Sequence, residues 1–220
     1  MHLRSVFDRQ LALLDAQLLV MGSTVEGAVV SAMGVLETRD AQEARRVMEM
    51  DDQTDRMERD IESLCMNLLL TQQPVARDLR RVSSALKMVG DMERIGDQAA
   101  DICRDVTALE GQLDPDLTRH LNRMGQRACG IVHGAVEAFV ERDAEQAARV
   151  IGEDEEINLL FEKVKKDIVT AIQTEADPAS SLVEALMIAK YLERIGDHAK
   201  NIAEWVEYSL TGRYKGGSIG

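Results

Sequence analysis

The segment Glu93–Asp97 reads E-R-I-G-D, and the same five residues recur unchanged at Glu193–Asp197, 100 positions further along the chain. Upstream of each copy the likeness continues, because R-D-A at Arg39–Ala41 recurs at Arg142–Ala144 with an offset of 103. Self-similarity at a near-constant spacing marks a duplicated structural unit. The sequence therefore predicts two copies of one fold that differ by small insertions or deletions.

The composition of the 220 residues indicates helices. Hydrophobic residues make up 45% and charged residues 30%, whereas aromatic residues make up only 3% and prolines number three. Alanine, leucine, methionine, glutamate and arginine, which are strong helix formers, are abundant. We predict an all-α fold with six long helices, at residues 5–38, 40–71, 75–109, 115–141, 144–175 and 179–210.

Short connections between consecutive helices favour antiparallel neighbours, so each repeat is predicted to be an up-down-up three-helix bundle. The predicted domains are a first repeat at 1–110, a second at 111–211 and a flexible tail at 212–220 that contains four glycines. Capping signals mark the helix starts. They are Asp40 with Glu43, Asp143 with Gln146, Asp114–Pro115, Asp177–Pro178 and Pro74.

Net charge and cysteine usage limit the class of protein. The formal net charge of −13 argues against nucleic acid or an anionic membrane surface as a direct partner, because the chain would repel phosphate groups. Cys65, Cys103 and Cys129 form no C-x-x-C pair, which is typical of reduced thiols in an intracellular protein. No run approaches about 18 uninterrupted apolar residues, and charges interrupt any signal-peptide pattern at the N-terminus. The sequence thus predicts a cytoplasmic protein.

Two acidic residues continue the apolar stripe of the third predicted helix. At about 100° per residue, Glu93 and Asp97 fall within about 40° of that stripe. Its apolar members are Val75, Leu79, Val82, Leu86 and Val89. Beyond the acids the apolar residues change to the opposite side of the helix, at Ile95, Ala99, Ile102 and Val106.

The sixth predicted helix repeats this arrangement. Glu193 and Asp197 continue the line of Leu182, Leu186 and Ala189. The apolar residues Ile195, Ala199, Ile202 and Val206 lie opposite. Because both copies keep acids where a core stripe would run, these positions are candidates for a function.

An E-x-x-x-D pair places two carboxylates one helical turn apart, about 5–6 Å between Cβ atoms, which suits a shared hard cation. Asp101 extends the first column, and Asp51 with Asp55 form a second acid pair on the preceding helix. In the second repeat, Asp154 corresponds to Asp51. Asparagines occupy the positions that correspond to Asp55 and Asp101, namely Asn158 and Asn201. The second site is therefore predicted to be the weaker of the two.

The glycines within the two motifs, Gly96 and Gly196, indicate that something packs close to the helix backbone there, since glycine inside a helix costs about 1 kcal/mol relative to alanine. An alternative stays open for the acids. Arg94 and Arg194 could pair with them as ordinary surface ion pairs. His198 is a further possible ligand, although a lone histidine is more often a surface residue or a neighbour of the ligands.

Together these motifs resemble the PhoU family, the accessory regulators of bacterial phosphate transport, over nearly the whole chain. The segments that carry the resemblance are Gln73–Arg80 (Q-P-V-A-R-D-L-R), Asp91–Ala99 (D-M-E-R-I-G-D-Q-A) and Leu192–Ile202 (L-E-R-I-G-D-H-A-K-N-I). The resemblance implies two three-helix bundles, a homodimer or larger assembly, and a negative regulator of phosphate uptake and of the phosphate-starvation response. It also implies contacts with the ATPase subunit of the phosphate ABC transporter and with the phosphate-sensing histidine kinase.

Metal clusters held by E/D-x-x-x-D motifs are a further implication of the resemblance, with iron, manganese, magnesium or zinc as the candidate ions. Transferred residue by residue, the ligands are Asp51, Asp55, Glu93, Asp97 and Asp101 in the first repeat and Asp154, Glu193 and Asp197 in the second.

Nothing in the sequence predicts catalysis, because it contains no phosphate-binding glycine loop, no nucleophile motif and no H-E-x-x-H. Two alternatives stay open. A ferritin-like metal-binding or oxidoreductase bundle would need Glu-x-x-His pairs, and none of the four histidines has a glutamate three residues before it. The other alternative is a helical adaptor that binds no metal.

Overall fold

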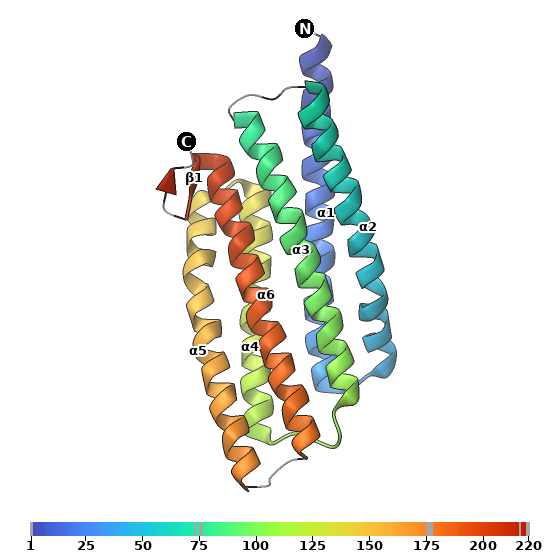
Figure 1. Ribbon diagram of the computed structural model, residues 1–220, viewed down its shortest axis with the longest axis vertical. Helices are drawn as coiled ribbons and strands as arrows, with labels where there is room; N and C mark the ends of the chain where they lie inside the picture. Colours follow the sequence, from blue (N-terminus) through green and yellow to red (C-terminus); the bar gives the residue numbers. More distant parts are fainter. Residues whose placement is uncertain (1, 73, 75–76, 175–177, 216, 219–220) are drawn as a thin grey trace.

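The structure is a computed structural model that describes residues 2–72, 74, 77–174, 178–215 and 217–218. The all-α prediction is confirmed: six long helices make up nearly all of these residues, with ends within a few residues of those predicted (Figure 1). They are α1 (His2–Thr38), α2 (Ala41–Gln72), α3 (Arg77–Ala108), α4 (Pro115–Glu141), α5 (Ala144–Thr174) and α6 (Ala179–Thr211).

The two repeats stand side by side as up-down-up bundles, α1 to α3 in one and α4 to α6 in the other (Figure 1). Helices α3 and α6 pack against each other at the centre, and α1 also contacts α4. Buried apolar side chains from all six helices form one continuous hydrophobic core. The repeats are therefore joined by a shared core, with the acid-bearing helices α3 and α6 in the middle of the molecule.

The aspartates predicted to cap helices do so where they are described. Asp40 Oδ1 accepts hydrogen bonds from the amides two and three residues further on, at 2.8 and 3.2 Å. Asp143 Oδ1 does the same at 2.8 and 3.0 Å, and Asp114 Oδ1 at 2.8 and 3.2 Å. These bonds satisfy amides that have no partner inside the helix. The predicted cap Asp177 lies outside the described residues.

The apolar stripe of α3 is shorter than predicted. Val82 and Val89 are fully buried, but Leu79 is 44% exposed. Leu79 lies in the first turn of α3, near the end of the bundle where fewer neighbours cover it. Val75 lies outside the described residues. The four apolar residues beyond the acids in α3 and the four in α6 are buried as predicted. Met88 and Met92 are buried on that same side of α3 before the acids, so the buried face does not change there but already includes both sides.

A short hairpin follows α6 where the sequence predicts a flexible tail. Strands β1 (Arg213–Tyr214) and β2 (Gly217–Ser218) pair antiparallel. The ring of Tyr214 stacks on Trp205 of α6 with 4.1 Å between ring centroids. Flexibility of the segment 212–220 stays a prediction from glycine content, and the aromatic contact is an interaction that would oppose it.

Helix α1 is apolar enough, by length and composition, to cross a membrane between Val6 and Thr38. Of an apolar 18-residue segment within this stretch, 44% is buried inside the molecule, and α1 packs against α2, α3 and α4. The core helix of a globular protein can be as long and as apolar as a membrane span.

Candidate metal centre

Three of the predicted ligands of the first repeat come together between α2 and α3. One carboxylate oxygen from each of Asp51, Asp55 and Asp97 lies within 4.8 Å of the other two. Asp51 and Asp55 are one turn apart on α2, and Asp97 faces them from α3. The predicted ligand set requires that α2 and α3 face each other, and in the structure these two helices pack together.

The other two predicted ligands of this repeat lie one turn to either side of Asp97. The side chain of Glu93 is 12% exposed, and that of Asp101 is 26% exposed. Arg94 pairs with Glu93 at 3.3 Å and with Asp97 at 2.8 Å. Asp101 pairs with Arg104. Of the two arginines that the sequence left open as partners of the acids, Arg94 thus forms such ion pairs.

Mutual repulsion and burial change the acidity of the cluster. Burial, a hydrogen bond with Asp97 and the neighbouring negative charges raise the pKa of Asp51 to about 6. Burial, followed by the charge of Asp97, raises the pKa of Glu93 to about 7, against the opposing effect of Arg94. A bound cation would stabilise the ionised form of these carboxylates, because it would offset the negative charges of their neighbours.

Glu58 belongs to the same cluster and was missed by the sequence argument. Its pKa is raised by burial and by nearby carboxylates, and its charge in turn raises the pKa of Glu93. Glu58 follows Asp55 by three residues and Asp51 by seven, so all three lie on one face of α2. That spacing was visible in the sequence and could have revealed it.

Glycines allow α2 to approach α3 closely at the cluster. A Cβ added at Gly96 would lie 3.0 Å from Thr54 Oγ1, closer than side chains normally pack. In the second repeat, a Cβ at Gly196 would lie 2.9 Å from Ile157 Cδ1. Thr54 and Ile157 are related by the 103-residue offset. The expected close packing is confirmed, and both repeats have the same helix register.

The donor set of the first repeat fits a hard cation. Its ligands are carboxylate oxygens, the type that Mg²⁺ and Mn²⁺ prefer and that iron and zinc accept. Asp51 Oδ1 is buried and has no hydrogen-bond partner, so a polar atom inside the cluster lacks a donor. The arginines nearest the cluster are largely exposed, 56% for Arg94 and 64% for Arg59 and Arg104. They border the cluster and do not fill it.

The corresponding acids of the second repeat have a different environment. Asp154 is 2% exposed, and its Oδ2 accepts hydrogen bonds from Lys200 Nζ at 3.0 Å and Asn158 Nδ2 at 3.3 Å. Glu193 pairs with Lys190. Burial raises the pKa of Asp197, and so do Glu193 and Asp154, while the two lysines oppose the shift. Within the described residues, Asp154, Glu193 and Asp197 do not converge as the first three acids do.

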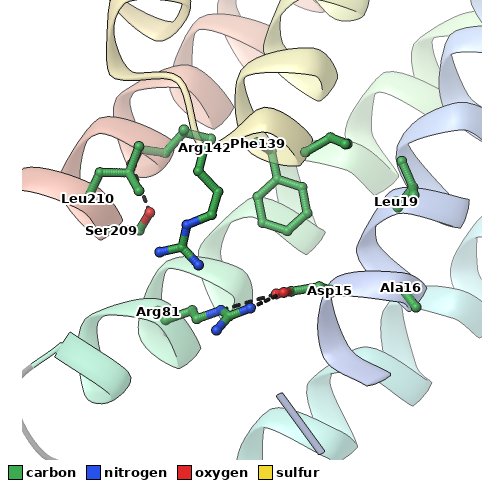
Figure 2. A pocket seen from close by; sticks show the side chains of 10 residues that line it. Asp15, Ala16, Leu19, Arg81, Phe139, Arg142, Ser209 and Leu210 are labelled. Atoms are coloured by element: carbon green, nitrogen blue, oxygen red, sulfur yellow. Dashed lines mark hydrogen bonds and ion pairs between the residues drawn. The ribbon is translucent and has the colours of Figure 1, made fainter. Parts of the chain in front are cut away.

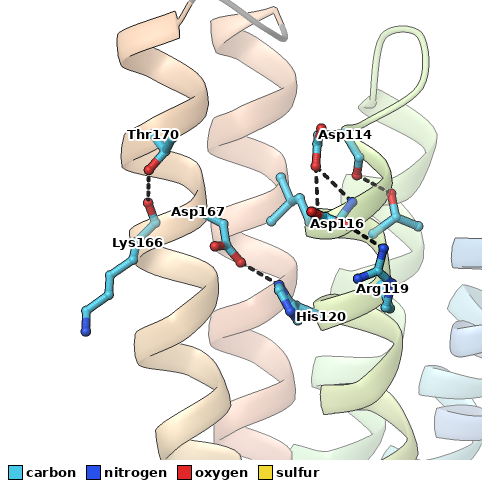
Figure 3. Close-up of polar contacts among 9 residues, drawn as sticks. Asp114, Asp116, Arg119, His120, Lys166, Asp167 and Thr170 are labelled. Atoms are coloured by element: carbon cyan, nitrogen blue, oxygen red, sulfur yellow. Dashed lines mark hydrogen bonds and ion pairs between the residues drawn. The ribbon is translucent and has the colours of Figure 1, made fainter.

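The described histidine side chains lie away from the first carboxylate cluster. His198 Nδ1 lies 2.9 Å from Asp91 Oδ1, across the interface between α6 and α3. At one end of the second repeat, His120 of α4 faces Asp167 of α5 at 2.5 Å (Figure 3). His133 pairs with Glu26 of α1 at 2.9 Å. This arrangement gives no support to the Glu-x-x-His pairs of a ferritin-like site.

A separate cavity of about 150 Å³ lies where the repeats meet. Figure 2 shows the guanidinium groups of Arg81 and Arg142 directed into it. Arg81 is held by Asp15, with 3.2 Å between Nε and Oδ1. Apolar side chains from α1, α4 and α6 form most of the remaining wall. This cavity contains none of the predicted ligands.

The fold and the cluster define a class of protein: a duplicated three-helix bundle with a carboxylate cluster between two helices of its first repeat. Comparison with known proteins gives the family. The PhoU domain matches residues 18–106 and again 121–206. The chain belongs to the PhoU family.

Relatives and a solved structure agree with this assignment. A phosphate-specific transport system accessory protein PhoU homolog from Clostridium acetobutylicum is 32% identical over 96% of each chain. The accessory protein PhoU of Escherichia coli (strain K12) is 32% identical over 96% of this chain and 88% of its own. The crystal structure of PhoU from Pseudomonas aeruginosa matches with a TM-score of 0.91 at 35% identity, over 94% of this chain and all of that chain.

Proposed function

We propose that the protein is a non-enzymatic negative regulator of phosphate uptake and of the phosphate-starvation response. It acts in the cytoplasm, as a homodimer, through contacts with the ATPase subunit of a phosphate ABC transporter and with a phosphate-sensing histidine kinase. Through these partners it is peripheral to the inner membrane. Family membership supports the transport role, because the relatives are named accessory proteins of the phosphate-specific transport system.

The observation that carries a metal-dependent form of this function is the convergence of Asp51, Asp55 and Asp97 within 4.8 Å. These three carboxylates would hold an iron, manganese, magnesium or zinc ion, with Glu93 and Asp101 adjacent on α3. The ion would supply positive charge that offsets the repulsion within the cluster. It would thereby connect α2 to α3 and change the charge of a partly exposed face that a partner protein can contact.

A gene deletion tests the regulatory role. Deleting the gene should leave phosphate-starvation genes switched on in phosphate-rich medium, and the wild-type gene should restore repression. Normal repression in a clean deletion strain without a second copy would contradict the proposal. Pull-down of the tagged protein from cells grown in high and low phosphate tests the partners, with the ATPase subunit and the histidine kinase as the expected captures.

A second candidate function, that of a metal-free helical adaptor, is favoured by the ion pairs of Arg94 with Glu93 and Asp97. Elemental analysis of protein purified without chelators separates the two. The metal-dependent form requires stoichiometric metal that is lost when Asp51 and Asp97 are both changed to asparagine. The adaptor requires none, and the same double variant should then repress as well as the wild type.

A further inference from the structure

Two lysines of α6 take the places of two small residues of α3. By the 100-residue offset that relates the E-R-I-G-D motifs, Lys190 corresponds to Gly90 and Lys200 to Ala100. Each lysine adds a positive charge beside the second motif at a position that is uncharged in the first. The difference concerns positions next to the ligands, so a comparison of the motifs alone does not show it.

Lys200 binds the most buried acid of the second repeat. Its Nζ lies 3.0 Å from Asp154 Oδ2, and Asp154 is 2% exposed. A carboxylate this deeply buried is strongly destabilising unless a cation or several hydrogen bonds compensate it. The ammonium group of Lys200 therefore offsets the buried negative charge of Asp154. A bound cation would have the same effect on Asp51, the corresponding acid of the first repeat.

Lys190 compensates the second acid, Glu193, with which it forms an ion pair. Its Nζ also lies 5.4 Å from the centroid of the Phe161 ring, within the range of a cation–π contact. Phe161 occupies the position that corresponds to Glu58 by the 103-residue offset. One further carboxylate of the first cluster is thus replaced by a ring that favours a neighbouring ammonium.

The charges of the two clusters differ accordingly. The first combines six acids, and the cations beside it are arginines that are 56% to 64% exposed. Those acids are Asp51, Asp55, Glu58, Glu93, Asp97 and Asp101. The second combines Asp154, Glu193 and Asp197, with the buried Glu204 one turn beyond Lys200. Its cations are the ammonium groups of Lys190 and Lys200, which are 44% and 35% exposed.

We propose that Lys200, assisted by Lys190, is the resident cation of the second cluster, so that in this chain only the first repeat takes up a metal ion. The residues of the second repeat then do not fit the metal that the family resemblance implied for Asp154, Glu193 and Asp197. The proposal extends the proposed function, since it rests on metal binding by the first repeat. The second repeat then neutralises its buried acid with its own side chain: Asp154 Oδ2 carries the contact with Lys200, while Asp154 Oδ1 is buried without a hydrogen-bond partner.

Mn²⁺ binding to the full chain tests the proposal, with bound and free Mn²⁺ measured by electron paramagnetic resonance. Asp97→Asn should abolish tight binding, and Asp197→Asn should leave it unchanged. The double variant Lys190→Ala, Lys200→Ala should gain about one ion per chain, because it exposes a vacant carboxylate set to a hard cation. Asp197→Asn introduced into that double variant should remove the gain.

Lys163→Ala is the matched control, because Lys163 is an exposed residue of α5 and its loss changes the net charge without touching the cluster. It should gain no ion. A measurement of thermal stability covers the case in which the double lysine variant is unstable. Lys200→Met keeps the aliphatic stem but leaves Asp154 unpaired, so its melting temperature should fall and millimolar Mn²⁺ should restore it.

Each outcome decides the proposal. Loss of Mn²⁺ from Asp197→Asn in an otherwise wild-type chain would overturn it, and so would the absence of any gain in a folded double lysine variant. If the wild type binds no Mn²⁺, the metal-dependent form of the proposed function fails. The lysine proposal is still tested in that case, because a gain that Asp197→Asn removes would support it.

Discussion

The backbone of α3 at Gly96 lies so close to Thr54 of α2 that a Cβ added at Gly96 would sit 3.0 Å from the Thr54 hydroxyl oxygen. That hydroxyl donates to backbone carbonyls of its own helix, at 2.9 Å to Asp51 and 3.2 Å to Met50. Thr54 is 2% exposed, so it has little room to move away. The close approach of the two helices brings Asp51 and Asp97 together.

We predict that Gly96→Ala destabilises the protein even though alanine is the better helix former. At Gly27, where an added Cβ meets nothing within 4 Å, the same change should stabilise by about 0.5–1 kcal/mol. At Gly96 that gain is opposed by the contact with Thr54, which would have to move by a few tenths of an ångström although it is buried and hydrogen-bonded to its own helix. Urea denaturation of both variants checks this. A Gly96→Ala protein as stable as Gly27→Ala would show that the helices separate freely.

Ionisation of the first cluster should destabilise the metal-free fold as the pH rises. Glu93 has a folded-state pKa of about 7, above its ordinary value of 4.5. The folded chain therefore binds this proton more tightly than the unfolded chain. The resulting stability is complete below the ordinary pKa and is lost as the pH rises through about 7.

The variant Glu93→Gln isolates this effect from other carboxylates, such as the helix cap Asp143, whose pKa is lowered and whose contribution has the opposite sign. In the presence of EDTA, the melting temperature of Glu93→Gln relative to the wild type should rise between pH 5 and pH 8. Glu145→Gln, an exposed change in α5, should give a flat difference. A flat difference for Glu93→Gln as well would contradict the raised pKa.

The sequence predicted the six helices because its signals for them are local: helix-forming composition, aspartate caps such as Asp40 and Asp143, and apolar periodicity. It also placed Asp51, Asp55 and Asp97 in one site, since the duplicated motif located one helix and a second acid pair located the other. Such signals need no knowledge of how distant segments pack.

What the sequence argument missed depends on contacts between elements. The ion pair of Lys200 with Asp154 joins α6 to α5, and a count of carboxylates cannot register it. The contact of Tyr214 with Trp205 of α6 likewise joins two elements and has no local signal in the sequence. Glu58 is different, because its spacing on α2 was visible but no motif drew attention to it.

Metal should stabilise the fold without creating it. The apolar core runs through all six helices independently of the acid cluster, so EDTA should leave the circular dichroism signal nearly unchanged. Saturating Mn²⁺ should raise the free energy of unfolding, by about 2.7 kcal/mol at 100 times Kd. Asp97→Asn should abolish this gain, whereas Asp116→Asn, at an exposed acid of α4, should keep it. Loss of helicity on adding EDTA would instead make the ion structural.

The contact between Tyr214 and Trp205 allows the order of the C-terminal segment to be tested in solution, because Trp205 is the only tryptophan of the chain. The two rings stack at an interplanar angle of 23°, and Tyr208 meets Trp205 edge-on with 5.7 Å between centroids. Tyr214→Ala should expose one face of the indole, shift its emission to longer wavelength and increase quenching by iodide. An aromatic pair of this kind contributes about 0.5–1.5 kcal/mol, so the melting temperature should fall only slightly.

Arg213→Ala, at an exposed neighbour in β1, should leave the emission unchanged. Identical spectra for Tyr214→Ala and the wild type would mean that the hairpin does not stay on α6, and the flexible tail predicted from glycine content would then be the better description.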